Sequence, residues 1–211
     1  TDSQTFDSSI AKQLVPLVNQ AMVIGKKYDV VVANPPYLSG KGMNPVLKTF
    51  AKNKFQESKG DLFAMFIQHG FRFAKTHGFN AMVTMQSWMF LSSFESLRRL
   101  MLSKSTLSDL VQIGYNSFPS LNSKVAQATA FVCKNTIISD YTGTFLDLNT
   151  APQSANKKDV FLRRDASIIY FLQQREFLKI SGNPIAFWVS DRVREIFQEF
   201  LALDNIAEPK Q

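Results

Sequence analysis

A short apolar run that ends in two prolines constrains the fold of this chain more than any other feature. Residues 28–33 (Tyr-Asp-Val-Val-Val-Ala) contain three consecutive β-branched valines, which is typical of a strand buried on both faces of a parallel α/β sheet. Asn34-Pro35-Pro36-Tyr37 follows at once and must end the strand, because proline has no N–H to donate to a ladder. Ligands of open α/β sheets bind beyond the carboxyl ends of the strands. The sequence therefore predicts an α/β fold with a candidate site at this turn.

Apolar patterning divides much of the remaining chain into alternating helices and strands. Apolar residues at helical spacing predict helices over 7–24, 61–75 and 94–102, with Asp61 near the N-cap of the second. Short apolar runs predict further strands over 79–85, 107–113, 128–133 and 144–148. Such alternation indicates a mostly parallel sheet with helices on both faces.

The remaining segments are predicted to connect or extend this sheet. The last two strands have no helix-length gap between them, so we expect them to form an antiparallel hairpin. Residues 39–59 predict a polar, basic loop, and residues 151–164 a linker. The helical patterns at 165–179 and 190–203 predict a helical C-terminal extension.

The composition excludes several classes of protein. With 45% hydrophobic and 19% charged residues, the chain is not intrinsically disordered. The single cysteine, Cys133, excludes a disulfide framework and a cysteine-based zinc site, and two histidines make a metal centre unexpected. The chain has no apolar run of the ~20 residues that cross a bilayer and no signal peptide, so we expect a cytoplasmic protein without a membrane partner. Because the first residue is not Met, we expect a processed or excised piece.

Positive charge is concentrated in the first part of the chain. Residues 1–150 carry 15 basic and 9 acidic side chains, a net charge of +6, whereas residues 151–211 have a net charge of +1. Seven lysines fall within residues 26–59, where the only acidic residues are Asp29 and Glu57. A local excess of this kind attracts nucleic acid, although a solvated lysine-rich loop would explain it equally well. The lysines that we select as candidate DNA contacts are Lys41, Lys48, Lys52 and Lys54.

The residue types of the turn suit the activation of an aromatic amine. Such an amine is a poor nucleophile, because its lone pair is delocalised into the ring. Two acceptors, the Asn34 side-chain oxygen and the Pro35 carbonyl, can draw the nitrogen toward tetrahedral geometry, and the prolines hold these dipoles in place. Tyr37 offers a flat face for a base that has been extruded from a duplex, typically worth ~1–3 kcal/mol. The alternative is that the prolines only end the strand and Tyr37 packs on the surface.

Several strings of the sequence resemble one family of enzymes. Asn-Pro-Pro-Tyr after an apolar strand is similar to motif IV of the S-adenosylmethionine-dependent amino methyltransferases, chiefly those that act on adenine N-6 in DNA. Longer strings closely resemble the large adenine-specific methyltransferases of the BREX/Pgl phage-defence systems, which are Eco57I-like restriction-modification methylases. These strings are Tyr28 to Tyr37, Gly40 to Asn44, Ser58 to Phe63, Met85 to Phe94 and Gly182 to Ser190.

This resemblance implies roles for individual residues. It implies a bacterial enzyme with a Rossmann-like fold, in which Asn34, Pro36 and Asp61 contact S-adenosylmethionine. Phe66 matches an aromatic residue that lines the cofactor's adenine pocket. Phe118, in Ser-Phe-Pro, is similar to an aromatic residue that packs on the flipped base opposite Tyr37. The alternative for each phenylalanine is a place in the core, since the chain has nineteen of them.

Part of such an enzyme has no counterpart in the sequence. A complete site needs a glycine-rich loop after the first strand and an acidic residue after the second. Only 27 residues precede Tyr28, which is too few for a strand-helix-strand unit of ~30. We therefore expect residues 1–150 to be the C-terminal half of a catalytic domain with an incomplete cofactor pocket, and 151–211 to lead toward a target-recognition region. Val30–Val32 should then expose a strand edge that permits self-association.

Three functions remain open from the sequence. The first is methylation of adenine N-6 in double-stranded DNA, in concert with other phage-defence or restriction-modification subunits. The second is methylation of a protein glutamine or of a guanine in ribosomal RNA, because Asn-Pro-Pro-Tyr is also found in enzymes of those kinds. The third is a non-catalytic module that binds DNA or a partner protein.

Overall fold

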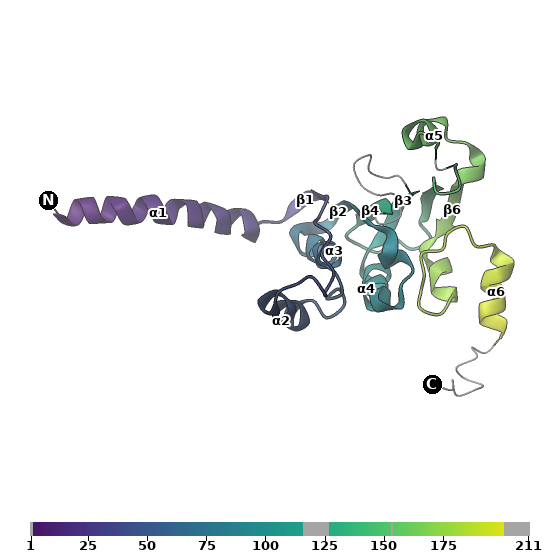
Figure 1. Ribbon diagram of the computed structural model, residues 1–211, viewed down its shortest axis with the longest axis horizontal. Helices are drawn as coiled ribbons and strands as arrows, with labels where there is room; N and C mark the ends of the chain where they lie inside the picture. Colours follow the sequence, from purple (N-terminus) through teal and green to yellow (C-terminus); the bar gives the residue numbers. More distant parts are fainter. Residues whose placement is uncertain (1, 116–126, 153, 201–211) are drawn as a thin grey trace.

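Six strands form one mixed sheet in the computed structural model, which describes residues 2–115, 127–152 and 154–200 (Figure 1). The order across the sheet is β1-β2-β4-β3-β5-β6. The strands are β1 (Tyr28–Ala33), β2 (Ala74–Met85), β3 (Thr106–Gly114), β4 (Ala128–Lys134), β5 (Thr142–Asp147) and β6 (Ile169–Gln173). The α-helices are α1 (Asp2–Gly25), α2 (Pro45–Lys54), α3 (Leu62–Phe73), α4 (Glu95–Lys104), α5 (Lys157–Arg163) and α6 (Asp191–Glu199), and short 3-10 helices include η1 (Gln86–Met89) and η4 (Gln174–Lys179).

The predicted α/β class is confirmed, and so is the prevailing strand direction. β1 pairs with β2 in parallel, and β3 pairs with β5 in parallel. β4 is antiparallel to both β2 and β3, and β6 is antiparallel to β5. Four of the six strands (β1, β2, β3 and β5) therefore run in the same direction.

The expected hairpin between the strands at 128–133 and 144–148 is wrong. β4 inserts between β2 and β3, and β5 pairs with the other edge of β3. Phe131 and Cys133 of β4 are fully enclosed, and an interior position gives this strand hydrogen-bond partners on both sides. A short loop permits a hairpin, but it does not decide which strand edges are free.

Three connecting segments also differ from the prediction. The expected loop at 39–59 contains α2, which Asn44 caps by accepting a hydrogen bond from the Leu47 amide at 2.8 Å. The expected linker at 151–164 contains α5. The expected helix at 165–179 is instead strand β6 followed by η4, because β6 completes the open edge of β5. For residues 169–173, the tertiary pairing with β5 outweighs the local helical pattern.

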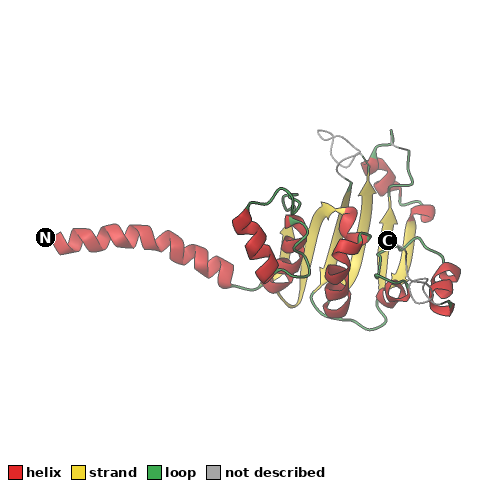
Figure 2. Cartoon of the chain, turned by 60° about the horizontal axis from the view of Figure 1, so that its bottom comes forward, coloured by secondary structure: helices red, strands yellow, loops and turns green. Residues whose placement is uncertain are grey.

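The two faces of the sheet are covered unequally. α3 and α4 pack on one face, where Phe63, Ile67 and Leu97 join the main core (Figure 2). On the second face, α5 packs near β3 and β5 through Val160. Over β1 and β2 that face has exposed apolar side chains, with Val32 74% exposed. The prediction that strand 28–33 is buried on both faces is therefore wrong, because β1 has no helix over this face in the described structure. Helices on both faces are thus found only at the β5 end of the described sheet.

Strand β1 is the edge strand that the sequence predicts to be exposed. It lies at one end of the strand order, and Val30 and Val32 are both exposed. Self-association through this edge stays a prediction. No helix among the described residues is long and apolar enough to cross a membrane.

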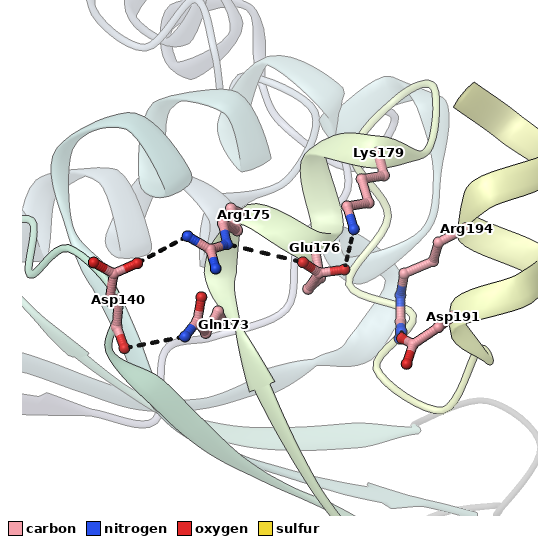
Figure 3. Close-up of polar contacts among 7 residues, drawn as sticks. All are labelled: Asp140, Gln173, Arg175, Glu176, Lys179, Asp191 and Arg194. Atoms are coloured by element: carbon pink, nitrogen blue, oxygen red, sulfur yellow. Dashed lines mark hydrogen bonds and ion pairs between the residues drawn. The ribbon is translucent and has the colours of Figure 1, made fainter. Parts of the chain in front are cut away.

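The C-terminal extension is held to the sheet by apolar packing. Phe177, Ile185 and Phe187 are buried in the main core. Figure 3 shows the polar contacts nearby, such as Arg175 with Asp140 at 2.8 Å. This ion pair is exposed on both sides and contributes only about 0–1 kcal/mol. The buried aromatic and aliphatic side chains therefore supply most of the attachment.

Arg98 of α4 fastens this extension to the main core. The residue is 1% exposed. Its guanidinium donates to the carbonyls of Trp88 at 2.9 Å, Leu91 at 2.7 Å and Gly182 at 2.6 Å. The Ile185 amide also donates to the Met89 carbonyl at 2.9 Å. One buried cation thus joins α4, the exit of β2 and the turn at Gly182.

Candidate functional site

The Asn-Pro-Pro-Tyr turn lies at the carboxyl end of β1, as the sequence predicts. β1 places it there because Ala33 is the last residue of the strand and pairs with Met82 of β2. Asn34 and Pro36 are exposed, and Pro35 is buried. The turn therefore presents the asparagine amide at the surface and rests on a buried proline.

Asp61 ties this turn to α3. Its Oδ1 accepts hydrogen bonds from the Leu38 amide at 3.0 Å and from the Phe63 amide at 3.3 Å, the second of which caps α3. The Leu62 amide donates back to the Leu38 carbonyl at 3.0 Å. Burial raises the pKa of Asp61, and these backbone hydrogen bonds act in the opposite direction. The sequence predicts Asp61 as a cofactor contact, and the structure shows that it fixes the turn relative to α3.

Tyr37 is half-buried against the main core. Its ring meets Phe63 edge-on, with centroids 6.0 Å apart and planes at 85°. Its hydroxyl is buried and has no hydrogen-bond partner among the described residues. Burial raises the pKa of this phenol, so it is neutral and able to donate at pH 7. An unpaired buried hydroxyl typically costs about 1–3 kcal/mol, which a ligand acceptor would recover.

An apolar groove of about 340 Å³ runs along α3 beside β1. Phe66, predicted to line a cofactor pocket, is 41% exposed and forms part of its wall. Ala33 also lines the groove, so the groove reaches the base of the turn. None of the four turn residues lines it. The structure thus brings Phe66 close to the turn but gives it a separate hollow.

Three glutamines near the carboxyl ends of β2 and β3 form a cluster that the sequence analysis missed. Gln112 Nε2 donates to Gln86 Oε1 at 3.1 Å, and Gln86 Nε2 donates to Gln127 Oε1. Gln112 is 4% exposed, and its Oε1 has no partner among the described residues. β1, β2 and β3 run in the same direction, so this cluster lies on the same edge of the sheet as the turn. The only sequence signal was Gln86 at the exit of a predicted strand.

Three of the four candidate DNA contacts share one helix, and the fourth lies outside it. Lys41, Lys48, Lys52 and Lys54 are all exposed, and the last three belong to α2. Lys54 lines a different hollow, together with Arg72 and Lys104. Phe118 lies outside the described residues. Within the described part of the chain, no group of three or more His, Cys, Asp or Glu side chains could hold a metal ion.

The sequence is similar to known methylases over most of its length. Residues 4–118, more than half of the chain, match the family model described as the Eco57I restriction-modification methylase. The adenine-specific methyltransferase BrxX of Escherichia coli O9:H4 (strain HS) is 46% identical over 85% of this chain and 15% of its own length. The adenine-specific methyltransferase PglX of Lacticaseibacillus casei (strain Zhang) is 32% identical over 94% of this chain and 17% of its own length. The chain thus spans about one sixth of the length of these relatives.

A solved structure shares the fold. The methyltransferase subunit of a type I restriction-modification system from Streptococcus thermophilus superimposes with a TM-score of 0.51. The match covers 75% of this chain and 37% of the other, at 17% sequence identity. At this identity the match shows a common α/β architecture.

Proposed function

The chain belongs to the Eco57I restriction-modification methylase family, and from this premise we propose that it forms the amine-binding side of an adenine N-6 DNA methyltransferase. The observation that carries the proposal is the exposed Asn34 amide, held at a strand end by the buried Pro35 and by the Asp61 clamp. The two most similar relatives reported above are both described as adenine-specific methyltransferases.

The chemistry follows from two acceptors on one rigid turn. The Asn34 Oδ1 and the Pro35 carbonyl accept hydrogen bonds from the exocyclic amine of an extruded adenine, which increases the electron density available on its nitrogen. S-adenosylmethionine, when bound, would supply an electrophilic methyl group: the N–C bond would form as the S–C bond breaks, S-adenosylhomocysteine would leave, and the amine would lose a proton to solvent. Pro35 and Pro36 keep the acceptors in place, and Tyr37 contacts the base.

The decisive test is the product. Plasmid DNA incubated with the full-length protein and S-adenosylmethionine should acquire N6-methyladenine at one sequence context, read by single-molecule sequencing. Methylation of a protein glutamine or of ribosomal RNA in place of DNA would contradict the assignment of substrate.

We expect this chain alone to bind S-adenosylmethionine weakly. Phe66 and the apolar groove offer a flat wall that suits an adenine ring. A glycine-rich turn that opens a helix, needed for the charged end of the cofactor, is not found among the described residues. Calorimetry on the 211-residue chain should therefore show weak S-adenosylmethionine binding or none. Micromolar affinity would contradict this expectation.

We further propose that α2 contacts the DNA backbone. Lys48 and Lys52 are four residues apart on this helix, so they lie on one face. The Lys48→Gln/Lys52→Gln variant should bind duplex DNA more weakly, and the slope of log K against log salt should fall by about 1.8, because each phosphate contact contributes ~0.9.

A charge-matched variant provides the control for this DNA-binding measurement. Lys12 and Lys158 are both exposed, lie far from α2 in sequence and are not candidate DNA contacts. The Lys12→Gln/Lys158→Gln variant therefore loses the same charge without touching α2. If both double variants weakened DNA binding equally, the effect would come from the lower net charge, and α2 would not be part of the DNA interface.

The similar proteins suggest partner subunits for this protein. The Streptococcus thermophilus structure is a subunit of a restriction-modification system. We propose that this protein likewise acts with other defence or restriction-modification subunits.

A further inference from the structure

The cluster of Gln86, Gln112 and Gln127 is costly to bury and is not needed to join the strands. Gln112 is 4% exposed, and its Oε1 has no hydrogen-bond partner among the described residues. The backbone already joins two of these segments, because the Gln86 amide donates to the Gln127 carbonyl at 2.9 Å. An apolar side chain in place of Gln112 would leave no polar atom unpaired. A buried amide kept at this edge of the sheet therefore calls for a functional explanation.

The side-chain hydrogen bonds of the cluster run in one direction. Each glutamine has one carbonyl oxygen and one NH2 group to offer. The NH2 group of Gln112 donates to Gln86 at 3.1 Å, and the NH2 group of Gln86 donates to Gln127. The reverse direction would bury an NH2 group at the Gln112 end, and buried N–H groups without partners are rarer in proteins than unpaired carbonyl oxygens. The chain of hydrogen bonds therefore ends with the NH2 group of Gln127.

This NH2 group is the end of the cluster that a ligand can reach. Gln127 is half-buried, whereas Gln112 is buried. The Nε2 atom of Gln127 makes no hydrogen bond to another described residue. Because its Oε1 accepts from Gln86, the amide cannot turn its oxygen outward without breaking that bond. The cluster thus presents a hydrogen-bond donor in a fixed orientation.

The sheet places this donor across from Asn34, with β2 between them. Asn34 follows the β1 residue that pairs with Met82 of β2. Gln127 precedes the β4 residue that pairs with Met85 of β2. The two Cα atoms are therefore about 14 Å apart, from a strand spacing of about 4.8 Å and a rise of about 3.3 Å per residue. Two side chains with one base between them bridge a span of this size.

We propose that Gln127 Nε2 donates a hydrogen bond to a ring nitrogen of the extruded adenine, and that Gln86 and Gln112 are positioning residues for this amide. N1 and N7 are the two ring acceptors nearest to the exocyclic amine, and Gln127 donates to one of them. With the amine on the Asn34 turn, this second contact fixes the rotation of the base in its own plane. The inference rests on the proposed methylation of adenine and adds a residue that orients the base.

Base analogues in the DNA test this contact. 1-Deazaadenine and 7-deazaadenine each replace one ring nitrogen with C–H and keep the exocyclic amine. Duplex oligonucleotides carry adenine or one analogue at the methylated position of the sequence context found with plasmid DNA. In single-turnover reactions of the full-length protein with S-adenosylmethionine, one analogue should be methylated about tenfold more slowly than adenine, because it lacks one hydrogen-bond acceptor. Equal rates on adenine and on both analogues would overturn the proposal.

The variant Gln127→Met assigns the sensitivity to this residue. It removes the amide at nearly the same side-chain size, and it should methylate adenine about tenfold more slowly than the unmodified protein does. The penalty for the analogue should be about tenfold smaller in the variant than in the unmodified protein, because the contact is already lost. This ratio cancels any effect of the analogue on the reactivity of the amine itself. Equal penalties in the two proteins would contradict the contact.

The variant Gln127→Glu separates this contact from a role in joining the strands. Glutamate keeps an oxygen to accept from Gln86 but has no donor at pH 7. It should therefore methylate adenine at least as slowly as Gln127→Met, with thermal unfolding as the check on folding. Gln198→Glu makes the same chemical change on exposed α6 and should leave the rates unchanged within about twofold. Full activity of Gln127→Glu would show that this residue only joins the strands.

Failure of this inference differs from failure of the proposed function. If the unmodified protein methylates adenine in DNA and the Gln127 variants match it, only the contact is wrong. If the unmodified protein transfers no methyl group to DNA, the proposed function is wrong, and the contact with adenine is wrong with it.

Discussion

Replacing Asn34 with alanine should lower the rate of methyl transfer by about 10²–10³-fold while leaving the fold intact. The side-chain oxygen is one of the two acceptors proposed for the adenine amine, and loss of one preorganised group of this kind typically has an effect of about this size. Because Asn34 is exposed, its removal leaves no buried group unpaired. The measurement is transfer of a labelled methyl group to DNA by the full-length protein, with thermal unfolding as the check on folding.

Two further variants make this experiment specific. Asn34→Asp keeps an acceptor oxygen in the same place, so it should retain more activity than Asn34→Ala. Asn19→Ala removes an exposed amide from α1 and should leave the rate unchanged within about twofold. If Asn34→Ala kept full activity, the turn would not hold the amine. That result would favour the hypothesis that the chain is a non-catalytic binding module.

Replacing Arg98 with alanine should destabilise the protein by about 3–4 kcal/mol. The change leaves the carbonyls of Trp88 and Gly182 without their guanidinium donor, and each unpaired carbonyl costs about 1–3 kcal/mol. It also opens a cavity. Urea unfolding followed by circular dichroism measures the loss. We also expect residues 180–188 to become more accessible to protease, because Arg98 binds the turn at Gly182.

The neighbouring arginine supplies the matched control. Arg99 is exposed and pairs only with Glu95 at 2.7 Å among the described residues. Such pairs contribute about 0.3–0.5 kcal/mol, so Arg99→Ala should be close to neutral. Similar losses for the two variants would show that the buried hydrogen bonds of Arg98 do not anchor the extension.

Much of the candidate site could be read from the sequence because it is local. The β-branched run and the two prolines fix a strand and its end within ten residues, and Asp61 caps α3 from the adjacent position. The resemblance to adenine methyltransferases rests on these same strings and is confirmed by the family match. The roles proposed for Tyr37 and Phe66 stay predictions, and Phe118 lies outside the described residues.

Other features depend on partners that are distant in sequence. Asp61 could be recognised as a cap, but its bond to Leu38 depends on a loop 23 residues earlier. The glutamine cluster joins the ends of β2 and β3 to the start of β4, and Arg98 reaches Gly182 across 84 residues. Neither spacing nor composition signals such pairs.

The sequence by itself determined the α/β class, the position of the Asn-Pro-Pro-Tyr turn and the cap of α3, because each depends on steric and hydrogen-bonding preferences of neighbouring residues. Only the tertiary structure decided that β4 lies between β2 and β3 and that residues 169–173 form a strand. An apolar segment can satisfy its backbone as a helix or as a strand. Which of these it adopts depends on whether a strand edge is free beside it, and the rest of the fold determines that edge.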